Sequence, residues 1–159
     1  LSEAVPITDL KRVLELLSNI NISKMSIVEI AEIIRPALVG LLIQKICPIN
    51  KELSVITISP EMEQIIINAL KEKNTTGISL DPTFTKNMLT AIAQAYETAS
   101  SKGDNCILLT SPIIRKDLAI LIRQNIEDLH VLAFTELPET RRINIIATIE
   151  NKLQEENNK

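Results

Sequence analysis

The apolar residues of the chain follow two different spacings, which divide it into helix-like and strand-like segments. Over residues 8–17 and 26–46, Leu, Ile and Val recur every three or four positions, which predicts two helices. Short runs rich in β-branched residues then predict strands at 53–58, 106–110, 130–134 and 143–149. The helical patterns between the first three runs each begin at a proline that follows a capping residue: Ser59-Pro60, Asp81-Pro82 and Ser111-Pro112.

These segments predict a mixed fold of the α+β or α/β class. We expect a small helical subdomain over residues 1–48, an α/β subdomain over 49–150 and a polar tail over 151–159. The strand, helix and strand over 106–134 predict a βαβ crossover, which requires the two strands to be parallel. The pattern leaves the direction of the final strand open.

The helix expected over 26–46 has the most unusual pattern. It begins with Ser26-Ile-Val-Glu29, which matches the capping box that starts many helices. Its apolar residues cover more than one stripe, so it packs on two sides, and Pro36 is expected to kink it.

Composition narrows the classes of function. The 159 residues are 45% hydrophobic but only 2% aromatic, which supports an aliphatic core and gives little basis for stacking on bases or sugars. A net charge of -3, with both signs spread along the chain, argues against a nucleic-acid partner. Cys47 and Cys106 stand far apart and suggest buried, reduced thiols. Because the chain begins at Leu1 rather than Met, we expect a longer parent protein.

Few residues carry candidate chemistry. The lone His130 has no ligand or triad companions, so it is interpreted as a residue at the solvent edge that starts a strand. The start of the helix at Ser111-Pro112 is either a plain cap or an anion site. Glu136 and Glu139 flank Pro138 in a segment interpreted as an exposed, solvated loop or as a partner-binding loop. We therefore expect no enzyme, no cofactor and no metal.

The helix over 112–125 is predicted to bury one apolar side. Ile114, Leu118, Leu121 and Ile122 form that side at helical spacing. Arg115, Lys116 and Arg123 are predicted to point outward, as charged side chains usually do.

An ordered set of segments carries a family resemblance over nearly the whole chain. The segments are 5–15 (Val-Pro-Ile-Thr-Asp-Leu-Lys-Arg-Val-Leu-Glu), 55–63, 78–82, 108–112 with Arg115, 131–138 and 143–149. Together they resemble the C-terminal cytoplasmic region of the FlhA/InvA-like export-gate family of type III secretion. Thr8, Pro36 and Gly40 depart from the family pattern.

The resemblance implies a non-enzymatic platform in protein export. The parent would be a bacterial inner-membrane protein with an N-terminal membrane portion, and this part would face the cytoplasm. It would form a homo-oligomeric ring, nonameric in the family, and would dock export chaperone-substrate complexes and other export components, including the ATPase complex. The helix over 26–46 is then either an ordinary core helix or one that buries one side against a neighbouring subunit of the ring. The closing Ala-Thr-Ile149 favours a flagellar system.

Five residues are candidates for protein-protein contacts: Glu29, Arg35, Phe134, Glu136 and Arg141. A small-ligand or regulatory α/β module that binds an anion at Ser111-Pro112 is the alternative function. An enzyme that uses Glu136 or His130 is a third hypothesis.

Overall fold

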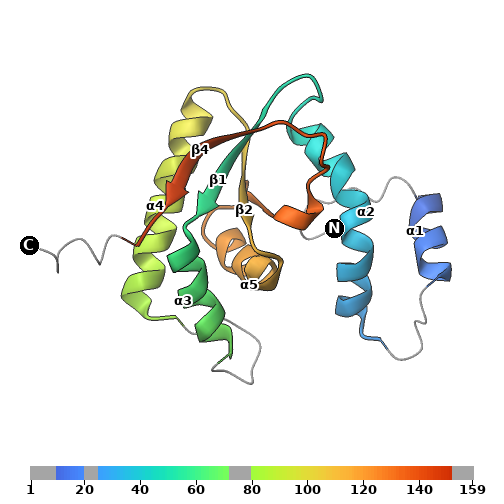
Figure 1. Cartoon of the computed structure of the whole chain (residues 1–159), viewed down its shortest axis with the longest axis horizontal. Helices are drawn as coiled ribbons and strands as arrows, with labels where there is room; N and C mark the ends of the chain where they lie inside the picture. Colours follow the sequence, from blue (N-terminus) through green and yellow to red (C-terminus); the bar gives the residue numbers. More distant parts are fainter. Residues whose placement is uncertain (1–9, 20–24, 72–79, 152–159) are drawn as a thin grey trace, which may run out of the picture.

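The computed structural model describes residues 10–19, 25–71 and 80–151 (Figure 1). Within them the elements run in the order α1 (Leu10–Ser18), α2 (Ile27–Ile46), β1 (Leu53–Ile58), α3 (Pro60–Lys71), α4 (Pro82–Ser101), β2 (Cys106–Thr110), α5 (Pro112–Arg123), β3 (His130–Ala133), the short 3-10 helix η2 (Phe134–Glu136) and β4 (Ile143–Ile149). Thr8 and most of the predicted polar tail lie outside the described residues.

The four strands form one sheet in the order β3-β2-β1-β4, and every neighbouring pair is parallel. The predicted mixed α/β fold and the βαβ crossover, β2-α5-β3, are thereby confirmed. The final strand, whose direction the sequence left open, is also parallel and lies beside β1.

Local hydrogen bonds start the helices where the sequence predicted. The Ser26 hydroxyl accepts from the Glu29 amide at 3.2 Å, and a Glu29 carboxylate oxygen accepts from the Ser26 amide at 2.7 Å, so the capping box is confirmed. The Asp81 side chain accepts from the Phe84 amide at 2.9 Å. α2 runs through Pro36 as one continuous helix.

Helices cover both faces of the sheet. On one face, α3, α4 and α5 pack on Ile56, Leu108 and Val131. On the other, α2 packs on Val55, Leu109 and Leu132, and α1 lies outside α2, away from the sheet (Figure 1). The core therefore has two apolar layers separated by the sheet.

α2 and the sheet share one apolar cluster, in which Leu42 and Ile43 meet Leu53 and Leu132. The expected boundary between a helical subdomain (1–48) and an α/β subdomain (49–150) crosses this cluster. That division stays a prediction, and the packing ties the position of α2 to the sheet.

Candidate protein-protein interface

Two of the five candidate residues, Arg35 and Glu136, meet in the core. Each is 8% exposed, and the Arg35 Nε donates to Glu136 Oε1 at 2.7 Å. The second carboxylate oxygen of Glu136 accepts from the Ala133 amide at 2.7 Å, and Arg35 also donates to the Val131 carbonyl at 3.2 Å. The pair joins α2 to the end of β3.

The interpretation of Glu136 as a solvated loop residue is therefore wrong. It closes η2 and turns inward, because the buried Arg35 guanidinium needs an anion beside it. The outward prediction for Arg115 is also wrong. Arg115 is 3% exposed and forms an ion pair with Glu32 of α2. In both cases the partner lies far away in the sequence.

Arg141, a third candidate, holds the connection between β3 and β4 against the end of α2. Its Nη2 donates to the Cys47 carbonyl at 2.8 Å and to the Pro48 carbonyl at 3.0 Å. The Asn105 side-chain amide donates to the Ile46 carbonyl at 3.1 Å. These contacts satisfy the Ile46 and Cys47 carbonyls at the C-terminal end of α2, and the Pro48 carbonyl also accepts from the Lys51 amide at 3.1 Å.

The remaining candidates are exposed and differ in what they do locally. Glu29 takes part in the capping box, and hydrogen bonds from the Ser26 backbone and side chain lower the pKa of its carboxyl group. Phe134, in η2, is 46% exposed and places an aromatic ring at the surface beside the buried Glu136. Of the five candidates, Phe134 is the one with a large exposed apolar side chain.

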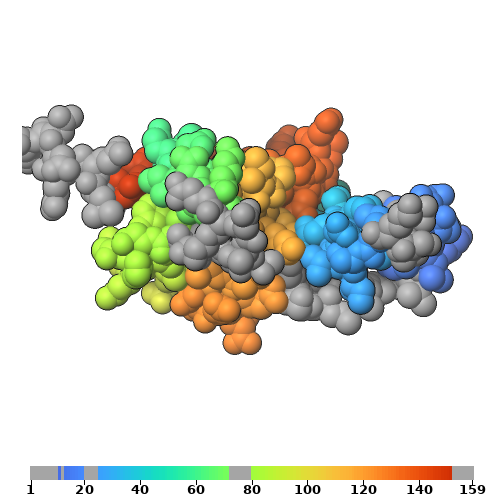
Figure 2. Space-filling view, turned by 90° about the horizontal axis from the view of Figure 1, so that it is seen from below, coloured from blue at the N-terminus to red at the C-terminus, as the bar shows by residue number. Residues whose placement is uncertain are grey.

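The first turn of α2 presents an apolar surface that sequence reasoning identified only in part. Ile27 is 85% exposed and Val28 is 49% exposed, yet they lie two helical turns before Ile34 and Arg35, which are buried. The inward stripe of the helix thus continues past the part that the sheet covers. Leu14 of α1 and Ile33 of α2 are also exposed, at 58% and 48%. Figure 2 shows α1 and α2, in blue, at one end of the molecule.

The start of α5, the candidate anion site, already holds a carboxylate from the chain itself. Glu63 Oε1 of α3 accepts from the Thr110 hydroxyl and from the Ser111 amide, both at 2.8 Å. The Ser111 hydroxyl accepts from the Ile113 amide at 3.4 Å, a long cap. An external anion would have to displace Glu63 from these donors.

Within the described ranges, no group of three or more His, Cys, Asp or Glu side chains has the arrangement of a metal site. No helix in that part of the chain has both the length and the apolar character needed to cross a membrane. His130 begins β3, as predicted, and is half-buried.

Known proteins resemble the chain in sequence and in structure. It is 31% identical over 151 residues to the flagellar biosynthesis protein FlhA of Buchnera aphidicola, with 93% of this chain and 21% of FlhA covered. It is 27% identical to the invasion protein InvA of Salmonella typhimurium, with 94% and 22% covered. The chain thus spans about a fifth of the length of these curated relatives.

Two solved structures have the same fold. The C-terminal domain of InvA matches with a TM-score of 0.75 and 26% identity, over 92% of this chain and 45% of that one. The nonameric EPEC SctV-C matches with a TM-score of 0.78 and 20% identity, over 92% and 44%. These matches confirm the resemblance that the sequence predicted. A model of the FHIPEP family covers residues 1–142, and the chain therefore belongs to the FHIPEP family.

Proposed function

We propose that this chain is the C-terminal cytoplasmic part of a type III export-gate component and works as a non-enzymatic assembly platform. Family membership and the 26% identity to the C-terminal domain of InvA support the export assignment. The commitment of both Glu136 oxygens to Arg35 and Ala133 supports a structural use of that carboxylate rather than a catalytic one.

The observation that carries the platform function is the exposed continuation of the α2 inward stripe at Ile27 and Val28. Such a stripe normally packs against another element, and an exposed apolar patch marks a contact surface. We propose that a neighbouring copy of the protein covers this turn, together with Leu14 and Ile33. SctV-C, which has this fold, is nonameric, and we propose that the present protein also forms a ring of nine copies.

The finer assignments are also proposals. We propose a flagellar system, which the 31% identity to a flagellar FlhA supports. We propose that export chaperone-substrate complexes and the export ATPase complex dock on the ring, and that the parent resides in the inner membrane. Restoration of swimming by the gene in a strain that lacks its own flagellar export gate would test the flagellar assignment. Failure there, with restored injectisome secretion in a matching strain, would refute it.

The ring is tested by comparing two matched substitutions in the full-length protein. Ile27→Gln removes apolar surface from the proposed contact, whereas Ile49→Gln makes the same change at a loop residue of similar exposure, 81%. We expect Ile27→Gln to weaken self-association at least tenfold in sedimentation velocity and Ile49→Gln to leave it unchanged. Equal behaviour of the two variants would contradict this assignment of the contact.

A further inference from the structure

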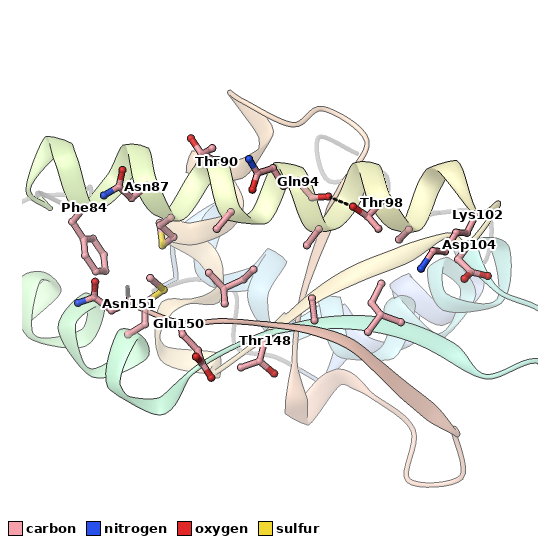
Figure 3. Close-up of a pocket in the computed structure, with 18 residues that line it drawn as sticks. Phe84, Asn87, Thr90, Gln94, Thr98, Lys102, Asp104, Thr148, Glu150 and Asn151 are labelled. Atoms are coloured by element: carbon pink, nitrogen blue, oxygen red, sulfur yellow. Dashed lines mark hydrogen bonds between the residues drawn. The ribbon is translucent and has the colours of Figure 1, made fainter. Parts of the chain in front are cut away.

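A groove lies between α4 and β4, on the face of the sheet opposite α2 (Figure 3). Its volume is about 740 Å³, within the range of about 300–1,000 Å³ that ligand sites occupy. Ala91 and Ala95 of α4 and Ile146 of β4 give it a floor of small and apolar side chains. We call it the α4-β4 groove.

One wall of the groove is the outer edge of the sheet. β4 is the last strand in the sheet order, and β1 is its one strand neighbour in the described part of the chain. Six consecutive residues, 146–151, line the groove. Side chains in a strand alternate between the two faces, so the side chains of consecutive strand residues cannot all point to the same side. The backbone of β4 therefore contributes to this wall, and an edge backbone carries donors and acceptors suited to a further strand.

The other wall is a row of uncharged polar side chains on α4. Asn87, Thr90, Gln94 and Thr98 follow one another every three or four residues along α4 (Figure 3), and all four are exposed and are among the residues that line the groove. The Thr98 hydroxyl donates to the Gln94 backbone carbonyl at 2.7 Å. The side-chain amides of Asn87 and Gln94 can each donate and accept hydrogen bonds. This wall offers hydrogen bonds without charge.

Charged side chains stand only at the ends of the groove. Lys102 and Asp104 lie at one end, and Glu150 and Asn151 lie toward the other, where the Glu150 carboxylate is on the side of β4 away from α4 (Figure 3). Lys102 and Asp104 carry opposite charges, so that end is close to neutral overall. The Glu150 end is negative and attracts a cation.

We propose that the α4-β4 groove binds an extended, uncharged segment of a partner polypeptide, which adds to β4 as a fifth strand and places a basic residue beside Glu150. An extended backbone carries donors and acceptors on both of its edges, so one edge meets β4 while the other meets the amides and hydroxyls of α4. Charged side chains in the middle of the segment would lose hydration over the apolar floor without gaining a partner. This proposal does not depend on the export function.

The size of the groove sets the probe. Residues 146–149 are the part of β4 along the groove, and four residues of strand extend roughly 13 Å at about 3.3 Å per residue. A fluorescein-labelled hexapeptide, Lys-Ala-Val-Ala-Val-Ala, covers that length and adds the basic residue. A reversed probe with Lys at the other end covers both strand directions. Two matched probes carry one change each: Glu in place of Lys, or Pro in place of the Val at the third position of the peptide.

Fluorescence anisotropy with the 159-residue chain measures binding, and amide chemical shifts locate it. We expect saturable binding of one Lys probe, with shift changes at Gln94, Thr98 and residues 146–149. The Glu probe and the Pro probe should each bind at least tenfold more weakly, because one loses the Glu150 contact and the other loses a strand hydrogen bond. Ala95→Leu, which fills the floor, should weaken binding by a similar factor.

The exposed Glu150 gives the sharpest variant. Glu150→Lys should reverse the preference, so that the Glu probe binds more tightly than the Lys probe. Absence of saturable binding, equal affinity for the Lys and Glu probes, or unchanged binding by Ala95→Leu would overturn the proposal. Concentration-dependent dimerisation that Ala95→Leu abolishes would also overturn it, because the occupant would then be a second copy. If circular dichroism shows that Ala95→Leu does not fold, the Glu150→Lys reversal decides alone.

Discussion

Removing one member of the Arg35–Glu136 pair should destabilise the fold more than a typical substitution does. The two side chains are 2.7 Å apart and each residue is 8% exposed, so Arg35→Met leaves the Glu136 carboxylate buried without its cation. Breaking a buried pair in this way costs about 3–5 kcal/mol. A domain of this size has a free energy of unfolding of roughly 5–15 kcal/mol, so the variant loses a large share of it.

The double variant Arg35→Met with Glu136→Gln separates pairing from packing. Glutamine keeps an oxygen that can accept from the Ala133 amide, which Glu136 now satisfies at 2.7 Å. Since both charges are removed together, most of the loss should be recovered, as happens when buried ion pairs are replaced by uncharged groups. We expect the double variant to be at least about 2 kcal/mol more stable than Arg35→Met alone.

Urea unfolding followed by circular dichroism measures these differences. With a slope of about 2 kcal/mol/M, a loss of about 3–5 kcal/mol lowers the midpoint by roughly 1.5–2.5 M. Arg142→Met, at an exposed arginine, is the control and should change stability by less than about 0.5 kcal/mol. A loss below about 1 kcal/mol in Arg35→Met, or a double variant no more stable than the single one, would refute the reasoning.

Three further predictions concern caps and titration. Ser26→Ala should lower the free energy of unfolding by about 1 kcal/mol in the same urea assay, because the capping box is lost. Burial first, and the nearby Asp104 charge second, raise the pKa of Cys106 from its ordinary 9.0 to about 11. The unfolded chain therefore releases this proton at lower pH than the folded chain does. The free energy of unfolding of the wild type, compared with that of Cys106→Val, should be constant below pH 9 and should fall between pH 9 and about 11. If the difference between the two free energies stays constant across that window, the assignment is contradicted. Glu63→Ala leaves the Ser111 amide and the Thr110 hydroxyl without their acceptor, so phosphate should raise the melting temperature of this variant and not that of the wild type. A rise in the melting temperature of the wild type with phosphate would instead favour an anion site.

Local signals accounted for most of the fold. The capping box at Ser26, the proline after Asp81 and the β-branched runs each act within a few residues, so a single sequence displays them in full. The parallel crossover followed from the order of those elements, because two neighbouring strands of one sheet that are joined through a helix run parallel. The fold class needed no long-range information.

The ionic contacts needed information that local patterns do not contain. Arg35 and Glu136 are 101 positions apart, and Glu32 and Arg115 are 83 apart. On a helix, a charged residue beside an apolar stripe normally points to solvent, and only the approach of α2 to β3 and α5 turned these arginines inward. Likewise, the two-sided pattern of α2 could not reveal that its first turn extends past the sheet.

The chain passes from β3, at one edge of the sheet, to β4, at the opposite edge, and this order affects how the sheet folds. Among the described strands, β4 comes latest in the sequence, yet it pairs with β1, the earliest of them. Thr57 and Thr148, whose hydroxyls are 3.0 Å apart, are separated by 91 positions. Pairing over such a distance closes a long loop and slows folding relative to local contacts. During synthesis, the edge of β1 that pairs with β4 therefore stays open until β4 has emerged, and only then can these four strands complete their sheet.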